Sequence, residues 1–338
     1  MEWAGLEENA VEDLVQLGWL VRTEGGYVIH QIVKDSLMRQ VGDNQRIEEY
    51  GDLLEKVADT ECYMPVELGY TKVRERLVLA EDVARSANRR IEEMLKIGEW
   101  SQVDETFLLS ISVLLNNIAG VYQAQGEYIK ALDYYGKALE VREKVLGSNH
   151  TDTSETYNNM AGVYQDQGEY GKALESYGKA LGIVERVLGS DHPYTAATYN
   201  NIAGVYQAQG EYEKALENYG KALEVRERVL GSDHPSTATT HNNMAGVYQA
   251  LGEYEKAQEY YGKALEVRER ILGSDHPSTA ATYNNMAVVY ENQGEYEKAL
   301  EYYEKALTVF MEKLGENHPY TQGTQRAVQK LKSLKKSD

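Results

Sequence analysis

Residues 199–207 read Tyr-Asn-Asn-Ile-Ala-Gly-Val-Tyr-Gln, and near copies of this stretch recur along the chain at a step of 42 residues. The paired asparagines fall at Asn116-Asn117, Asn158-Asn159, Asn200-Asn201, Asn242-Asn243 and Asn284-Asn285. Loop glycines and histidines keep the same step, at Gly126, Gly168, Gly210, Gly252 and Gly294, and at His150, His192, His234, His276 and His318. A fixed period of this length predicts a solenoid, whose units stack on their neighbours. We therefore expect a long repeated surface that is suited to holding a partner.

Composition excludes several classes of function. The chain has 338 residues and a net charge of −19, which would repel a phosphate backbone, so we do not expect nucleic acid as a ligand. Basic protein or peptide segments are electrostatically more favourable partners for this acidic chain than a phosphate backbone is. We find neither an apolar run long enough to span a membrane nor a secretory signal at the N-terminus. Cys62 is the only cysteine, so we expect a cytoplasmic protein without disulfides.

One repeat unit predicts two helices. Residues 195–209 carry apolar side chains at i, i+3, i+4 and i+7, and residues 211–230 carry a second apolar stripe. Gly210 and Gly231 end these helices, because glycine accepts the left-handed conformation that helix C-termini favour. The two helices are joined by a tight turn, so we expect them to pack as an antiparallel pair.

The connector to the next unit has its own signals. Pro235 suits the first turn of the following helix, and Ser232 and Asp233 suit its capping position. The connector histidines are spaced too far apart to share a metal ion, so we expect them to belong to this cap and predict no metal site.

The repeat resembles the tetratricopeptide repeat. The residues that carry the match in one unit are Tyr199, Ile202, Ala203, Tyr206, Gly210, Tyr212, Ala215, Tyr219 and Ala222. The long connector over residues 225–235 resembles the kinesin light chain subtype. The resemblance implies an all-α fold, a right-handed superhelical solenoid with five repeats over residues 110–319. It also implies a capping helix over residues 320–338.

The first helix of each repeat has an unusual polar face. First helices of the first, third and fourth repeats carry no charge, whereas residues 211–230 carry many charges, among them Arg226, and read as a solvated surface. In the tetratricopeptide family the first helix lines a concave groove, so the resemblance implies a peptide-binding groove there. Its expected residues are Asn116, Asn117, Asn158, Asn159, Asn200, Asn201, Asn242, Asn243, Asn284, Asn285, Gly162, Gly204, Gly246, Gln165, Gln207 and Gln249.

Two interpretations of the asparagines compete. Asparagine costs about 0.5–0.7 kcal/mol relative to alanine inside a helix. Either the amides bond between neighbouring helices and fix the stacking, or they clamp the main chain of an extended peptide while Gly204 gives it room. If they only clamp a peptide, replacing Asn158, Asn200 and Asn242 by alanine should preserve or raise stability and weaken binding. No first helix of the five repeats carries Lys or Arg, which disfavours a grip on a peptide's terminal carboxylate.

A few positions vary between repeats. His241 and Leu115 replace a tyrosine of the other repeats, and Asp166 and Asn292 replace an alanine. Random drift after duplication of the repeats explains this variation. The alternative is that these positions are adapted to bind a particular ligand.

The first 45 residues follow a different pattern. Residues 7–17 suggest a helix, residues 19–23 and 27–32 suggest two strands around a turn at 24–26, and residues 33–41 suggest another helix. This order is typical of a winged helix. Its candidate recognition helix is acidic, so we do not expect it to read DNA.

This segment resembles the winged-helix end of STAND-type ATPases of the NB-ARC group, through Leu14–Leu20 and Gly26–Asp35. The resemblance implies that His30 senses the nucleotide in an intact ATPase; the alternative is a half-buried histidine without a ligand. No phosphate-binding Gly-x-x-x-x-Gly-Lys-Ser/Thr loop occurs in the sequence. Residues 46–109 suggest a helical bridge that includes a degenerate repeat.

These patterns predict a binding protein that is not an enzyme and has no cofactor. We expect the protein- or peptide-binding sensor region of a STAND signalling ATPase, which the resemblance also allows to self-associate in a larger assembly. The alternative is a free-standing adaptor of the kinesin light chain type.

Overall fold

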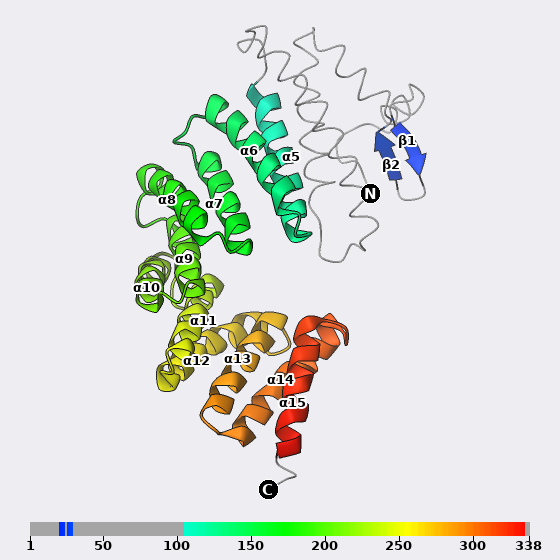
Figure 1. The fold of residues 1–338 in the computed structure, drawn as a ribbon, viewed down its shortest axis with the longest axis vertical. Helices are drawn as coiled ribbons and strands as arrows, with labels where there is room; N and C mark the ends of the chain where they lie inside the picture. The colour runs from blue at the N-terminus through cyan, green and yellow to red at the C-terminus, as the bar shows by residue number, and fades with distance from the viewer. Residues whose placement is uncertain (1–19, 24–25, 30–104, 335–338) are drawn as a thin grey trace. The chain divides into compact units, whose positions relative to one another are not determined.

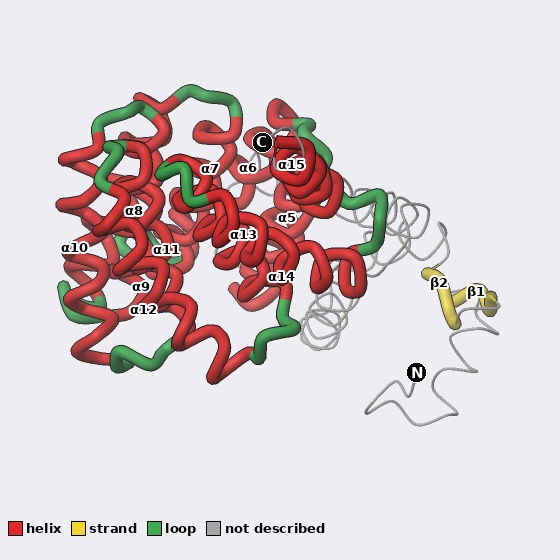
Figure 2. The backbone as a smooth tube through the Cα atoms, turned by 90° about the horizontal axis from the view of Figure 1, so that it is seen from below, coloured by secondary structure: helices red, strands yellow, loops and turns green. Residues whose placement is uncertain are grey.

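The computed structural model describes residues 20–23, 26–29 and 105–334. The chain divides into two compact units, Met1–Gln167 and Gly168–Asp338, and each unit is described by itself. The part of the chain between residues 105 and 334 is helical, with eleven α-helices joined by short turns (Figures 1 and 2).

The helices alternate between the first and second members of each repeat. The first unit contains α5 (Glu105–Ala124), α6 (Tyr128–Val145) and α7 (Thr151–Asp166). The second unit contains α8 (Tyr170–Val187), α9 (Pro193–Ala208), α10 (Tyr212–Val229), α11 (Pro235–Ala250), α12 (Tyr254–Leu272), α13 (Pro277–Asn292), α14 (Tyr296–Leu314) and α15 (Pro319–Leu334). The predicted solenoid of helix pairs is confirmed.

The predicted helix ends are close to the observed ones. Gly210 and Gly231 have φ angles of +76° and +90°, the left-handed region that glycine adopts without strain. Glu211 N–H donates to the carbonyl of Tyr206 at 2.9 Å, which closes the turn between α9 and α10. The glycine period therefore marks the places where the chain reverses.

The capping residue differs from the prediction. His234, not Ser232 or Asp233, occupies the N-cap of α11, and its Nδ1 accepts from Ser236 N–H at 3.1 Å. Pro235 fills the first helical position as expected. The same side-chain bond recurs at the other four connectors, from His150, His192, His276 and His318. The histidine period is thus explained by helix capping.

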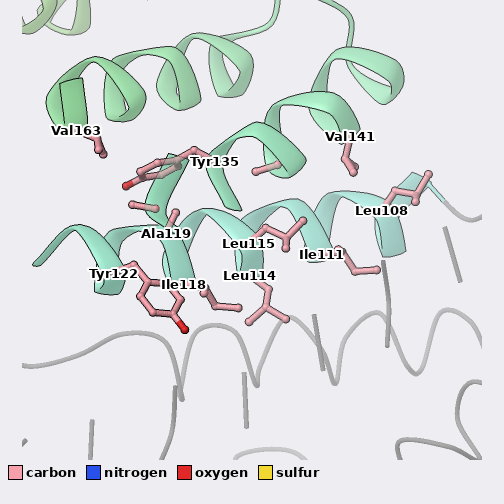
Figure 3. Packing of buried hydrophobic residues seen from close by; sticks show 12 residues of the cluster. Leu108, Ile111, Leu114, Leu115, Ile118, Ala119, Tyr122, Tyr135, Val141 and Val163 are labelled. Atoms are coloured by element: carbon pink, nitrogen blue, oxygen red, sulfur yellow. The ribbon is translucent and has the colours of Figure 1, made fainter. Parts of the chain in front are cut away.

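Among the described residues of the first unit, α5 and α6 share an apolar cluster. Ile111, Leu115 and Ile118 on α5 are fully buried in one cluster with Tyr135 and other side chains of α6 (Figure 3). Val163 on α7 joins this cluster. The alanines at the helix contacts have no exposed surface, which lets the helices approach closely.

In the second unit, small clusters repeat along the stack. Ala203, Ala215 and Tyr219 pack with Met244 and Val247 of the next repeat, and equivalent sets follow. The predicted capping helix is α15, whose Val328 and Leu331 cover Ala287, Ala299 and Tyr303.

A short hairpin lies near the N-terminus. Strands β1 (Leu20–Thr23) and β2 (Gly26–Ile29) pair antiparallel, with Leu20 opposite Ile29. This confirms the predicted hairpin, with shorter strands. The other predicted winged-helix elements, His30 and the bridge up to residue 104 lie outside the described residues.

Candidate functional site: the asparagine ladder

The paired asparagines bond to one another across successive repeats. The Nδ2 of the second asparagine of one repeat donates to the Oδ1 of the first asparagine of the preceding repeat. These bonds are Asn159–Asn116 at 3.2 Å, Asn243–Asn200 at 3.4 Å and Asn285–Asn242 at 3.5 Å. We call these six residues the asparagine ladder. The ladder joins the first helices of neighbouring repeats, so the amides have a structural role.

The ladder leaves complementary groups unused. The Nδ2 groups of Asn200 and Asn242 have no hydrogen-bond partner among the described residues, and neither do the Oδ1 atoms of Asn243 and Asn285. All four side chains are half-buried. Each of the two asparagine pairs in the second unit, which we call rungs of the ladder, therefore keeps one free donor and one free acceptor. The main chain of an extended peptide offers the matching carbonyl and N–H groups.

Buried arginines lie beneath the ladder. Arg226 on α10 is 8% exposed, and its Nη1 donates to Thr240 Oγ1 at 2.6 Å, to the Ser236 carbonyl at 2.9 Å and to Asn200 Oδ1 at 3.5 Å. The prediction that Arg226 lies on a solvated surface is wrong. The signal that could have found it is its spacing, because it lies on the same helical face as Ala215, Tyr219 and Ala222.

An arginine recurs at this position of the second helix, but not in every repeat. Arg268 on α12 makes the same bonds, to Thr282 Oγ1 at 2.6 Å, to the Ser278 carbonyl at 3.1 Å and to Asn242 Oδ1 at 3.4 Å. Val184 and Phe310 stand at the equivalent positions of α8 and α14, and both are buried. An apolar side chain is therefore an accepted alternative there.

The arginines differ in their counter-charge. Arg142 on α6 pairs with Glu155 at 3.1 Å. Arg226 and Arg268 form no ion pair in the described part of the chain, and burial lowers the pKa of both guanidinium groups. Their charge is held by neutral oxygens alone, two of which belong to the ladder.

The predicted groove glutamines are partly engaged in packing. Tyr219 donates its hydroxyl to Gln207 Oε1 at 3.0 Å, and Tyr261 donates to Gln249 Oε1 at 3.2 Å. Burial raises the pKa of both tyrosines to about 12, so they remain neutral donors. The glutamines therefore anchor the second helix of their own repeat through their carbonyl oxygens.

Packing does not require a glycine at residue 246. A Cβ added at Gly246 would lie 3.4 Å from Gln207 Nε2 and 3.6 Å from the Tyr261 hydroxyl, both ordinary contacts. Val288 occupies the equivalent position on α13. The interpretation that a glycine on this face gives a ligand room stays a prediction.

The variable position at His241 has a structural partner. Tyr157 and Tyr199 donate to Glu143 and Glu185 of the preceding second helix at 2.9 and 2.5 Å. His241 places its Nε2 3.6 Å from Glu227 in the same arrangement, and its buried Nδ1 has no hydrogen-bond partner in the described part of the chain. These side chains link repeats, and the substitution leaves one polar atom unsatisfied.

The last helix places positive charge where the ladder ends. Arg326 and Lys330 on α15 lie 42 residues after Asn284 and Val288, so they occupy the ladder-facing positions of a sixth first helix. Lys330 pairs with Glu291 at 2.8 Å. Arg326 is exposed, and its only hydrogen bond in the described range is Nε to the Gln322 carbonyl.

Comparison with known families decides the classification. A family model described as "Tetratricopeptide repeat" matches residues 110–186, 152–228, 194–261, 236–312 and 282–321. The chain belongs to the tetratricopeptide repeat family. The predicted resemblance is therefore confirmed for the repeats. No curated protein matches the chain.

Several solved structures share this fold. BtubC (BKLC) from P. vanneervenii is 24% identical with a TM-score of 0.57, covering 71% of this chain and 94% of that one. A putative kinesin light chain from Podosopora anserina with nearly identical TPR-like repeats is 25% identical with a TM-score of 0.51, covering 59% and 93%. A STAND protein with a tetratricopeptide repeat sensor from Pyrococcus horikoshii is 20% identical with a TM-score of 0.52, covering 94% and 47%.

Two kinds of feature are absent from the described residues. No described helix has the length and apolar character needed to cross a bilayer. Among the same residues, no three His, Cys, Asp or Glu side chains gather as a metal site would require.

Proposed function

We propose that this tetratricopeptide repeat array binds an extended peptide segment along the asparagine ladder. The observation that carries the proposal is the pair of unused groups on each rung, the Nδ2 of Asn200 or Asn242 and the Oδ1 of Asn243 or Asn285. Groups of this kind pair with the carbonyl and N–H of a main chain, and the glycine at residue 246 adds no side chain that would obstruct it. The other groove residues expected from the sequence are part of the same proposed surface.

We propose further that the array is the sensor of a STAND-type signalling ATPase. Support comes from the resemblance of residues 14–35 to the winged-helix end of such proteins and from the shared fold of a STAND protein with a tetratricopeptide repeat sensor. A kinesin-light-chain-like adaptor is the second candidate, supported by the shared fold of two kinesin-light-chain-like proteins. A cytoplasmic location suits either role.

Peptide binding is tested with the double variant Asn200→Ala/Asn242→Ala. A phage-displayed library of random peptides is selected on the immobilised chain, and the enriched peptides are measured against the variant by fluorescence anisotropy. We expect the variant to lose binding, with Asn317→Ala in the exposed connector before α15 as the matched control. Peptides that bind the unchanged chain and the Asn200→Ala/Asn242→Ala variant equally well would show that the ladder is not the binding site.

The choice between sensor and adaptor is tested on the transcript. Mapping the sequence 5′ of the codon for Met1 shows whether a phosphate-binding loop is encoded in the same open reading frame. A phosphate-binding loop supports the sensor, and an in-frame stop codon supports the adaptor.

A further inference from the structure

Three exposed apolar residues form a row along the second helices of the second unit. Val187, Val229 and Ile271 lie in the last turns of α8, α10 and α12, and they are 47%, 47% and 51% exposed. They stand 42 residues apart, at the same position of three successive repeats. We call these three residues the apolar row. Figure 1 shows α8, α10 and α12 following one another along one side of the second unit, so the row runs along the stack.

The row continues a buried stripe past the point where a first helix covers it. Val225 on α10 is 7% exposed and packs with Ala196 on α9. Val229 lies four residues further along the same helical face, whereas α9 begins at Pro193, only three residues before Ala196. The next repeat has the equivalent buried cluster. The turn that carries a row residue therefore extends beyond the start of the first helix, which is why its apolar side chain is exposed.

Exposed acid–base pairs accompany the apolar row. Each pair joins a base on a second helix to an acid of the connector before the first helix of that repeat: Arg228 with Asp191, Arg270 with Asp233, and Lys313 with Asp275. Both signs of charge therefore recur with the same period as the apolar residues. A partner with charges of one sign alone would meet a like charge at every repeat, which is unfavourable.

A second copy of this chain fits both the spacing and the charges. Its own row has the same period, so three apolar side chains can pack at once, whereas a partner of another spacing would align with fewer. Two identical rows related by a two-fold axis run in opposite directions, and the bases of one copy can then oppose the acids of the other. We propose that the second unit self-associates through the apolar row, as an antiparallel pair of copies.

This inference goes beyond the proposed peptide-binding function and does not depend on it. The apolar row lies on second helices, whereas the asparagine ladder lies on first helices. Because each copy offers only three half-exposed apolar residues, the contact is smaller than the interfaces of about 1,200–2,000 Å² that hold stable complexes. We therefore expect a weak association that depends on concentration, and that becomes important where several copies are held together.

The chain itself supplies variants that the fold accepts. Lys313 stands 42 residues after Ile271, at the row position of the fifth repeat. A lysine is therefore tolerated there, so Val187→Lys/Val229→Lys/Ile271→Lys removes the row with a side chain that the repeat already uses. In the opposite direction, Lys313→Val extends the row by a fourth apolar residue.

Leu251→Gln is the matched control. Leu251 is 38% exposed and follows the end of α11, away from the last turns of the second helices. Gln209 and Gln293 occupy the equivalent positions of the neighbouring repeats, so the fold accepts glutamine there. This variant removes an exposed apolar side chain and leaves the apolar row unchanged.

Sedimentation velocity of the full chain over a series of concentrations measures the association. We expect the unchanged chain and Leu251→Gln to shift from monomer to dimer as concentration rises, and Val187→Lys/Val229→Lys/Ile271→Lys to remain monomeric. Lys313→Val should lower the dissociation constant by about tenfold, because each dimer gains two partly buried valines. Circular dichroism checks that every variant remains helical.

Disulfide trapping tests the antiparallel arrangement. Val187→Cys and Ile271→Cys are introduced into separate chains that also carry Cys62→Ser, which removes the only native cysteine. An antiparallel pair places residue 187 of one copy near residue 271 of the other. Mild oxidation of the mixed chains should therefore give a linked dimer, whereas neither chain should link to itself. Linkage of each chain to itself, without linkage in the mixture, would overturn the antiparallel arrangement.

The remaining outcomes separate this inference from the peptide-binding function. A chain that stays monomeric at every concentration, with or without Lys313→Val, would overturn self-association. A dimer that survives Val187→Lys/Val229→Lys/Ile271→Lys would show that the apolar row is not the contact. The peptides selected on the unchanged chain should bind this triple variant with unchanged affinity, and a failure of the ladder to bind peptides would leave the dimer unaffected.

Discussion

Arg226 on α10 donates to the hydroxyl of Thr240 on α11 at 2.6 Å, so a buried guanidinium bridges the second helix of one repeat and the first helix of the next. The same bridge joins Arg268 to Thr282 and Arg142 to Thr156. The stacking of repeats therefore depends on polar bonds as well as apolar contacts. The valine at residue 184 shows that the bridge is optional.

The first prediction concerns this bridge. Arg226→Val should change the free energy of unfolding by less than about 1 kcal/mol, because replacing a buried charge by a packed apolar side chain is often close to neutral. Arg226→Ala should cost about 1–3 kcal/mol more, because it leaves a cavity. Urea denaturation followed by circular dichroism measures both. Equal losses in the two variants would contradict the packing argument.

The second prediction concerns the histidine caps. His234→Ala should lower the free energy of unfolding by about 1 kcal/mol, and His234→Asn by only a few tenths, because asparagine also caps helices. Ser232→Ala is the control, since Ser232 is exposed and forms no side-chain bond among the described residues. The thermal midpoints of the three variants give the comparison. A larger loss at Ser232 than at His234 would restore the sequence-based assignment of the cap.

The third prediction concerns pH. Burial, and then the positive charge of Lys263, lower the pKa of His241 below its usual value, whereas Glu259 raises it by less. The imidazole has one unsatisfied nitrogen, lies near Glu227 and contacts the ring of Tyr260. Because the unfolded chain takes up the proton first, stability should be full above about pH 6.5 and should decline as the pH falls through the folded-state pKa.

His241→Tyr tests this directly. The tyrosine hydroxyl can reach Glu227 as Tyr199 reaches Glu185, and it removes the orphan nitrogen. We expect a stability gain of about 1 kcal/mol at neutral pH and a larger gain at pH 5. Melting curves of both proteins at several pH values provide the measurement. A difference between them that does not grow in acid would exclude His241 as the cause.

The fourth prediction concerns two glycines of one repeat. Gly246→Ala should raise the free energy of unfolding by up to about 1 kcal/mol, because alanine favours the helix and its Cβ meets only ordinary contacts. Gly252→Ala should lower it, because Gly252 has a φ angle of +76°. If Gly246 makes room for a ligand, Gly246→Ala also weakens peptide binding. Destabilisation by Gly246→Ala would mean that the glycine is needed for packing.

The repeat pattern predicted the helices and turns because period, apolar spacing and glycines all act locally. The repeat pattern could not show that Arg226 is buried, because a charged side chain is normally solvated. Its hydrogen-bond acceptors, Thr240 and the Ser236 carbonyl, come from the next repeat. The connector histidines were expected to belong to the cap, but the N-cap position itself was assigned to Ser232 or Asp233, since serine and aspartate are the commoner capping residues. The ladder residues were found by repetition, but their mutual bonds depend on the stacking of neighbouring helices.

The fifth prediction concerns the ladder itself, where the structure changes the expected sign. Asn200→Ala gains about 0.5–0.7 kcal/mol of helix propensity. It also removes the acceptor of Asn243 and one acceptor of Arg226, each worth about 0.5–1.5 kcal/mol. The loss exceeds the gain, so Asn200→Ala should be destabilising, whereas Asn292→Ala at the exposed end of α13 should not be.

A double-mutant cycle isolates the bond between Asn200 and Asn243. Asn243→Ala removes the donor, so the double variant should lose less stability than the two single losses together, with a coupling energy of about 0.5–1 kcal/mol. Urea denaturation of the four proteins gives this energy. No coupling, together with an Asn200→Ala chain as stable as Asn292→Ala, would leave the asparagines no role in stacking. Ligand binding would then be the remaining explanation of their repetition.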